Sequence, residues 1–135
     1  MTPRIYLMGA VASLPDLGVG WRKVAAEAVI AAGGEPVYPP DIGKVAEGRI
    51  SAEAARRAWA SESGSLALRL ACLRVLGESD ASICLVDGNE GTGTEAESAF
   101  AGWIKQPVVY AHSATPASFA AAAAEAVAKA KEAHR

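Results

Sequence analysis

Short apolar runs alternate along the chain with longer segments in which apolar residues recur at helical spacing. The strand-like runs occupy residues 4–9, 36–38, 81–86 and 107–110. The segments with helical spacing occupy residues 19–32, 52–60, 66–77, 96–104 and 116–135. Strands that alternate with helices predict an α/β fold built on a parallel sheet.

Residues with strong local preferences mark several ends of these elements. Ser51 and Thr115 suit the N-cap position, where a side-chain oxygen accepts a hydrogen bond from the first turn of the helix. Residues 41–50 are polar and predict a loop. The pattern weakens at 61–65, which leaves open whether the segment 52–77 is one kinked helix or two.

Composition narrows the classes of protein that the chain can belong to. Its 135 residues, of which 51% are hydrophobic, suit a single domain spanning 1–135 with one sizeable core. The net charge is −2 and the pI about 5.7, so no basic surface is expected to neutralise a nucleic acid backbone. The longest apolar runs are too short to cross a membrane.

The chain has two cysteines, Cys72 and Cys84, both in apolar surroundings. Neither has the Cys or His spacing of a zinc site. We expect buried free thiols in a reducing cytoplasm, with a disulfide or a reactive thiol as the alternatives.

The stretch 81–95 carries the candidate chemistry. A buried-strand pattern leads into a loop with Gly88, Gly91 and Gly93, and Glu95 follows where the helical pattern begins. Open α/β sheets bind their ligands at the carboxyl ends of strands, in loops of this kind.

Three interpretations of this loop remain open on the residues alone. Its backbone N–H groups could hold a phosphate at a helix start, although the lysine of a P-loop and the GxGxxG pattern are absent. Thr92 with Glu95, or Thr94 with Glu97, could form a capping box with a purely structural role. Alternatively, Glu95 could be a nucleophile for a sugar carbon, kept ionised by backbone dipoles. The last two interpretations place Glu95 identically.

Several motifs together resemble those of the nucleoside 2-deoxyribosyltransferase family, which includes the related deoxynucleotide N-hydrolases. Its GTxxE…A…GKPV signature resembles Gly91-Thr92-Gly93-Thr94-Glu95, then Ala99-Phe100-Ala101, then Gln106-Pro107-Val108-Val109. The opening strand of the family, KIYLAGP, is similar to Arg4-Ile5-Tyr6-Leu7-Met8-Gly9. Val37-Tyr38-Pro39 is similar to the segment that follows the first helix of the family.

The resemblance implies a flavodoxin-like, or Rossmann-like, three-layer α/β sandwich with four or five parallel strands. It also implies cleavage of an N-glycosidic bond through a glutamate nucleophile and a covalent glycosyl-enzyme. Glu95 would be the nucleophile, and Tyr6 on the first strand would orient it through a hydrogen bond. The residues expected to bind substrate are Gly9, Asp87, Gly88, Asn89, Gly91, Thr92 and Gly93.

Four positions depart from the family pattern, one of them Ala10, where the family has a proline. Asn89 and Cys72 stand where the family carries aspartates, and Glu97 stands where it has a glycine. Counting back from Pro107 without a gap makes Glu97 the alternative nucleophile. Glu95 is preferred here because Gly91-Thr92 and the alanines after the site then both align.

The sequence therefore predicts an enzyme that cleaves or transfers at the N-glycosidic bond of a (deoxy)nucleoside or nucleotide. No metal or organic cofactor is implied, and neither nucleic acid nor a membrane is an expected partner. The family completes its sites across subunits, so a cytoplasmic homo-oligomer, a dimer or larger, is expected. The alternatives are a hydrolase without transfer activity and a non-catalytic nucleotide-binding module on the same fold.

Overall fold

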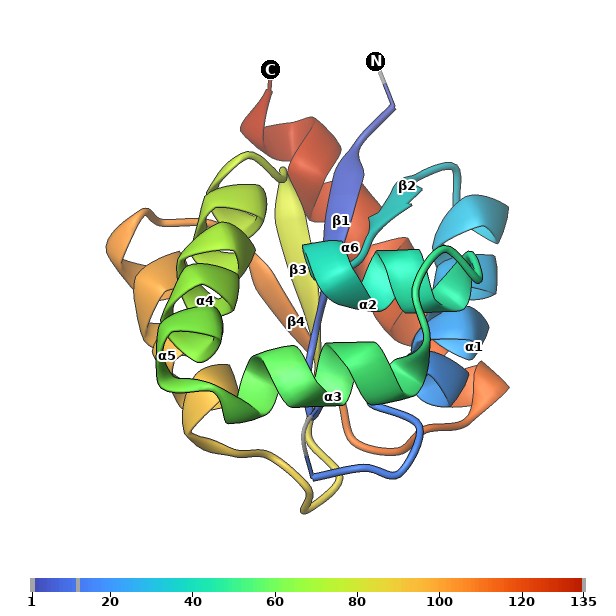
Figure 1. Cartoon of the computed structure of the whole chain (residues 1–135). Coiled ribbons are helices and arrows are strands. Elements are labelled where there is room, and N and C mark those ends of the chain that lie inside the picture. Colours follow the sequence, from blue (N-terminus) through green and yellow to red (C-terminus); the bar gives the residue numbers. More distant parts are fainter. Residues whose placement is uncertain (1, 12, 135) are drawn as a thin grey trace.

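A sheet of four parallel strands forms the centre of the computed structural model, which describes residues 2–11 and 13–134 (Figure 1). The strands are β1 (Arg4–Met8), β2 (Glu35–Val37), β3 (Ala81–Leu85) and β4 (Val108–Ala111). Their order across the sheet is β2-β1-β3-β4, and every neighbouring pair is parallel. The direction of winding thus reverses between β1 and β3, which is where a doubly wound sheet opens a crevice.

Helices on both sides of the sheet make it the middle layer of three. The helices are α1 (Val19–Ala31), α2 (Pro40–Ala46), α3 (Ala52–Ala60), α4 (Glu62–Gly77), α5 (Thr92–Trp103) and α6 (Pro116–Ala133). This arrangement confirms the predicted α/β class and is consistent with a flavodoxin-like three-layer fold. None of the described helices is long and apolar enough to cross a lipid bilayer.

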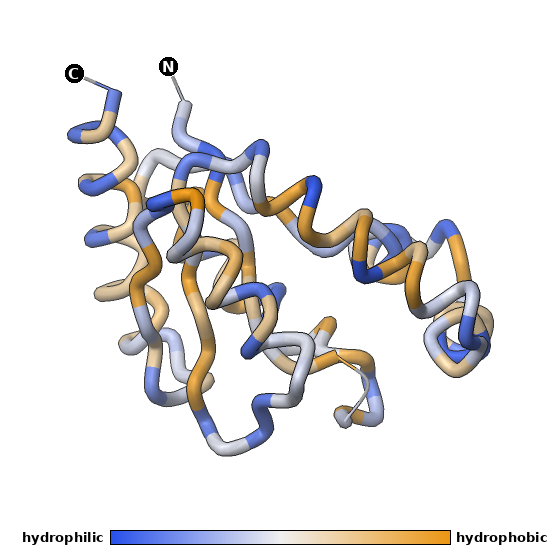
Figure 2. Tube along the Cα trace, turned by 90° about the vertical axis from the view of Figure 1, so that its left-hand side faces the viewer, coloured by the Kyte–Doolittle hydropathy of each residue, from blue (hydrophilic) through white to orange (hydrophobic). Residues whose placement is uncertain are grey.

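Alternate residues of each strand enter different hydrophobic layers. Ile5 and Leu7 of β1 belong to the core that α1 and α6 cover, whereas Tyr6 and Met8 pack in a second core with residues of α4 and α5. This division follows from the two-residue period of a strand. In Figure 2 the strands are largely hydrophobic, and the hydrophilic positions of α6 lie on the side of that helix away from the strands. The same period sends Tyr6 to the α4–α5 side of the sheet.

A third, smaller core holds α2 and α3 beside the carboxyl end of β1. It consists of Leu17 from the loop after β1, Ile42 from α2 and Ala55 from α3. The sequence predicted a loop over 41–50, but Pro40–Ala46 is helical. That prediction is wrong because Pro40 occupies the first helical position, where its fixed φ and missing N–H favour a helix.

Two of the predicted helix caps are present. Ser51 Oγ accepts a hydrogen bond from the Ala54 amide at 3.0 Å, and Thr115 Oγ1 accepts one from the Ser118 amide at 3.3 Å. The segment after Ser51 forms two helices rather than one, because Ser61 is extended and its hydroxyl caps α4.

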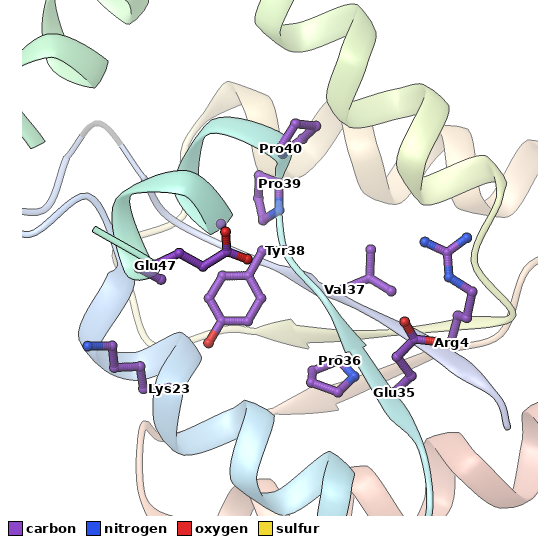
Figure 3. A pocket seen from close by; sticks show the side chains of 11 residues that line it. Arg4, Lys23, Glu35, Pro36, Val37, Tyr38, Pro39, Pro40 and Glu47 are labelled. Carbon is purple, nitrogen blue, oxygen red and sulfur yellow. The ribbon is translucent and has the colours of Figure 1, made fainter. Parts of the chain in front are cut away.

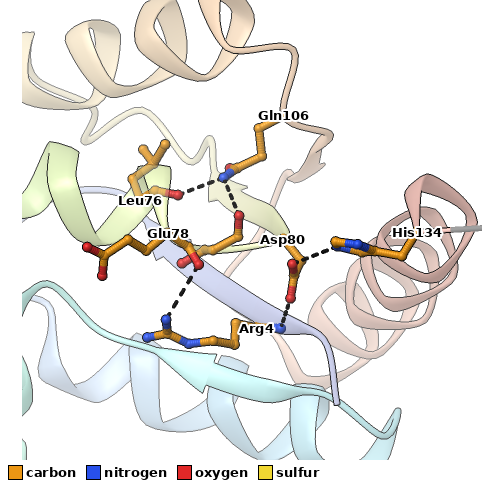
Figure 4. Close-up of polar contacts among 7 residues, drawn as sticks. Arg4, Leu76, Glu78, Asp80, Gln106 and His134 are labelled. Carbon is orange, nitrogen blue, oxygen red and sulfur yellow. Dashed lines mark hydrogen bonds and ion pairs between the residues drawn. The ribbon is translucent and has the colours of Figure 1, made fainter. Parts of the chain in front are cut away.

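Polar side chains tie the elements together at the amino ends of the strands, far from the crevice (Figure 4). Gln106 Nε2 donates to the carbonyls of Leu76 and Ser79 at 2.7 and 3.0 Å. One Asp80 oxygen accepts from the Arg4 amide, and the other lies 2.8 Å from His134 Nε2 near the end of α6. These contacts fix the amino ends of the strands and leave the carboxyl ends free to form the site.

Candidate active site

A cavity of about 510 Å³ lies at the carboxyl ends of β1 and β3, at the reversal point of the sheet. Its walls come from Tyr6 on β1, Trp59 on α3, Cys72 on α4 and the first turns of α5, including Gly91 and Glu97. The volume is within the range of small-molecule binding sites. Four segments that are distant in the sequence therefore meet around one space.

Tyr6 and Glu97 form a hydrogen-bonded pair that lines this cavity. Tyr6 is fully buried, and its hydroxyl donates to Glu97 Oε2. Glu95 is exposed and does not line the cavity. The expected pairing of Tyr6 with Glu95 is therefore wrong, and the alternative residue, Glu97, takes that place.

The phase of α5 explains this correction. Residues two apart on a helix project about 200° apart, so Glu95 and Glu97 cannot face the same strand. Thr94 and Ala101 are the buried residues of α5, and they flank Glu97 at intervals of three and four. Glu97 therefore lies on the stripe of α5 that faces the sheet, and Glu95 points away from it.

The predicted capping boxes are not formed. Gly91 is the N-cap of α5, with no side-chain hydrogen bond, and Thr92 is already the first helical residue. Thr92 and Thr94 line the cavity instead of capping the helix. A structural role for Glu95 or Glu97 as a capping carboxylate is thus not supported.

The surroundings of Glu97 set the protonation states of the pair. Burial raises the pKa of Glu97, while the Tyr6 hydrogen bond and the Arg22 guanidinium lower it in part. Burial and the neighbouring carboxylate together raise the pKa of Tyr6 well above its ordinary value. Tyr6 therefore remains the hydrogen-bond donor, and Glu97 is the acceptor.

Cys72 is a neutral part of the cavity wall. It is a free, buried cysteine, as the sequence predicted, and so is Cys84. Burial raises the pKa of Cys72 to about 12, which keeps its thiol protonated at neutral pH. Because the thiolate is the nucleophilic form of cysteine, Glu97 is the better candidate for a nucleophile.

Arg22 is a buried cation that the sequence analysis did not single out. Its guanidinium donates to the carbonyls of Leu7, Gly9 and Ala10 at 3.0–3.1 Å and lies 4.2 Å from the centroid of the Trp21 ring. It thereby holds the backbone where β1 passes into its loop, next to Tyr6. Its spacing in the sequence could have indicated that it is buried, because Arg22 shares one face of the helix with the buried residues Ala25, Ala26 and Val29.

Four of the predicted substrate-binding residues line the cavity: Gly9, Gly91, Thr92 and Gly93. A Cβ at Gly91 or Gly93 would meet no described atom within 4 Å, so the backbone there is open to a ligand. At Gly9 a Cβ would lie 2.6 Å from Trp21 Cζ2. That glycine is thus required by the packing of Trp21.

The other three predicted binding residues, Asp87, Gly88 and Asn89, do not line the cavity. They are exposed and form a turn closed by its own side chains: Asp87 Oδ1 accepts from the Asn89 amide at 3.1 Å. Glu90 accepts from the Gly88 amide. In the structure Asp87 thus caps its own loop, and Asn89 does not line the cavity.

A second cavity, of about 480 Å³, lies beside the edge strand β2 (Figure 3). It contains none of the predicted site residues, and its charged side chains are of both signs, Arg4 and Lys23 with Glu35 and Glu47. The Tyr6–Glu97 cavity is the stronger candidate, because it combines a hydrogen-bonded titratable pair, shielded in part from solvent, with the reversal point of the sheet. Within residues 2–11 and 13–134, no group of three or more His, Cys, Asp or Glu side chains is placed to hold a metal ion.

We expect Glu97→Gln to stabilise the protein at neutral pH. The folded-state pKa of Glu97 is raised above its ordinary value of 4.5, so the folded protein loses stability as pH rises through that folded-state pKa. Glutamine keeps an acceptor for Tyr6 and removes the buried charge. Thermal unfolding between pH 4 and 8 should show a stability gain that disappears at the acid end. Glu95→Gln, at an exposed position, serves as the matched control and should show no such gain.

Comparison with known proteins adds no relative on which to base an assignment: no protein-family model matches the chain, and the search of curated proteins gives no significant match.

Proposed function

We propose that the protein cleaves or transfers at the N-glycosidic bond of a (deoxy)nucleoside or nucleotide, with Glu97 as the nucleophile. The single observation that carries the proposal is the hydrogen-bonded pair of buried Tyr6 and half-buried Glu97 in a cavity at the reversal point of the sheet. The family that the sequence resembles uses a glutamate at this point of its fold. The proposal therefore changes the expected nucleophile from Glu95 to Glu97.

The proposed reaction has two displacement steps. In the first, a Glu97 oxygen forms an ester bond to the anomeric carbon while the carbon–nitrogen bond breaks, and its electron pair leaves with the base. The base nitrogen then takes a proton from water. In the second step, water or another base attacks the same carbon, and the bond from that carbon to the Glu97 oxygen breaks with its electron pair returning to the carboxylate. The proton of the attacking group neutralises the hydroxide left by the first step. Both steps pass through an oxocarbenium-like transition state, which a neighbouring carboxylate stabilises.

Tyr6 acts here as a positioning residue. Its hydroxyl occupies one oxygen of Glu97, so the other oxygen is directed for attack. The helix N-terminus beside it, with open backbone at Gly91 and Gly93, lets a substrate approach closely. The chemistry requires the groups of the chain, the substrate, and water or a second base as the acceptor of the sugar.

Product analysis tests the proposal directly. The protein is incubated with a panel of deoxynucleosides and deoxynucleotides, with and without a second free base. Release of base together with free sugar indicates hydrolysis, and appearance of the new nucleoside indicates transfer. An unchanged substrate across the panel would contradict the proposed activity.

A non-catalytic nucleotide-binding module is the second candidate. Two observations favour it: the wall of the cavity presents the neutral thiol of Cys72, and Asn89 lies outside the cavity, so neither supplies an acid to protonate the leaving base. Under this alternative, nucleosides bind without turnover, and Glu97→Gln leaves their affinity unchanged.

We expect Tyr6→Phe to shift the acid limb of the activity profile to higher pH. The acid limb reports protonation of Glu97. Burial raises the pKa of Glu97, and the Tyr6 hydrogen bond lowers it. Removing the hydroxyl removes this lowering effect, so the pKa of Glu97 rises further. A hydrogen bond to a charged group contributes about 1.5–3 kcal/mol, so kcat should also fall roughly 10- to 100-fold. An unchanged pH profile would show that Tyr6 does not act through Glu97.

We also propose that the protein acts as a cytoplasmic homo-oligomer. Large apolar side chains support association, because Leu66 and Leu70 of α4 and Trp103 of α5 are 58–81% exposed. The two free cysteines suit a reducing compartment. Sedimentation equilibrium should give at least a dimer, and a monomer at micromolar concentration would contradict the proposal.

A further inference from the structure

Trp59 forms part of the cavity wall, yet the proposed chemistry of Glu97 does not use it. The residue lies near the end of α3, and its indole is half-buried. Indole Nε1 donates a hydrogen bond to Asp41 Oδ2 on α2. The ring is therefore held by a side chain from a different helix, which fixes its orientation in the wall.

Asp41 accepts this hydrogen bond from a buried position, which is unfavourable for a carboxylate. It is 6% exposed, and its other oxygen, Oδ1, is buried without a hydrogen-bond partner among the described residues. A buried polar atom without a partner lowers stability. The Asp41–Trp59 contact is thus better explained by the placement of the ring than by a gain in stability.

The cavity that Trp59 lines has apolar residues in its wall and also the polar side chains of Ser13 and Arg69. Pro39, Val11 and Leu73 line the same cavity, whereas the titratable pair Tyr6–Glu97 supplies its reactive group. A flat aromatic side chain in a wall that combines apolar and polar residues matches a planar heteroaromatic ring, which stacks on an indole face while its edge atoms accept or donate hydrogen bonds.

We propose that Trp59 is the stacking wall for the base of the substrate, and that Asp41 is a positioning residue that sets the plane of the indole. The identification of the ligand as a base rests on the proposed function. The stacking contact itself rests on the cavity and on the Asp41–Trp59 bond.

Binding of unreactive probes tests this inference separately from the chemistry. The probes are free nucleobases and 2′-deoxypseudouridine, whose glycosidic bond joins two carbons and offers no nitrogen leaving group. Affinities are measured by calorimetry on the full chain. Trp59→Leu should weaken probe binding roughly 5- to 150-fold, the range expected for loss of one base–aromatic stack. Tyr110→Leu is the control, because Tyr110 on β4 is 51% exposed and does not line the cavity.

The role of Asp41 is tested by a double-mutant cycle. Asp41→Asn keeps an acceptor for the indole N–H and should bind the probes nearly as the unchanged protein does. Asp41→Leu removes the acceptor and should weaken binding. In the Trp59→Phe background, which has no N–H to orient, Asp41→Leu should have no further effect. A purely structural role for Asp41 would weaken binding equally in both backgrounds.

Three results would overturn the inference. They are wild-type affinity in a folded Trp59→Leu variant, no binding of any probe to the unchanged protein, and an effect of Asp41→Leu that persists in the Trp59→Phe background. Thermal unfolding of each variant verifies that it is folded. Because the probes cannot react, these results are independent of Glu97: loss of a sugar adduct at Glu97 would count against the proposed function alone.

Discussion

Glu97→Gln should abolish turnover, lowering kcat by at least about 10⁴-fold, as expected when the covalent nucleophile is removed. Glutamine has nearly the same shape and can still accept the Tyr6 hydrogen bond, so the cavity and the fold should be retained. Steady-state rates of base release, measured beside thermal unfolding, separate lost chemistry from lost folding. We expect an inactive variant that is at least as stable as the unchanged protein at neutral pH.

Glu95→Gln is the control for that experiment. Glu95 lies two residues away on the same helix, but it is exposed and outside the cavity. Its substitution should change kcat less than about threefold, since surface changes away from a site usually have small effects. If Glu95→Gln inactivated the protein and Glu97→Gln did not, the assignment of the nucleophile would have to be reversed.

Arg22→Met should destabilise the protein by about 3–5 kcal/mol, because it leaves several buried carbonyls without their charged donor. The guanidinium bonds to Leu7, Gly9 and Ala10 at the end of β1 and is fully buried. Methionine keeps much of the volume but supplies no N–H. Denaturant unfolding with an unchanged m-value would measure the loss.

Lys23→Met supplies the matched control for the Arg22 substitution. Lys23 is the next residue of α1 and is exposed, so the same loss of charge should change stability by less than about 0.5 kcal/mol. Equal effects at the two positions would show that charge, rather than the buried hydrogen bonds, accounts for the change. Arg22→Met should also raise the pKa of Glu97, because the guanidinium lowers it in the unchanged protein.

The main elements of the fold could be predicted from the sequence because their apolar runs are distinctive. The segment 81–86 has no polar alternation, as befits a central strand buried on both faces, and β3 occupies Ala81–Leu85. The helix α2 is not predicted because Pro39-Pro40, at its start, is equally compatible with a loop. A proline at the first position of a helix and a proline in a loop give the same local pattern, so tertiary packing of Ile42 decides between them.

The site could be predicted only in part, because the phase of α5 decides whether Glu95 or Glu97 faces the sheet. Motif spacing located the loop, the start of α5 and Tyr6, but it could not tell whether Glu95 or Glu97 faces the strand. The burial of Thr94 and Ala101 settles the phase, and those residues carry no chemical signal of their own. Trp59 and Asp41 lie on segments with no recognised motif, so only the folded chain brings them to the cavity region.

Intact-mass analysis of the protein after reaction with a deoxynucleoside tests the central claim most directly. The account predicts a covalent sugar adduct on the unchanged protein and on Glu95→Ala, no adduct on Glu97→Ala, and a modified peptide that maps to Glu97. An adduct that persists on Glu97→Ala, or one that maps to Glu95, would contradict it.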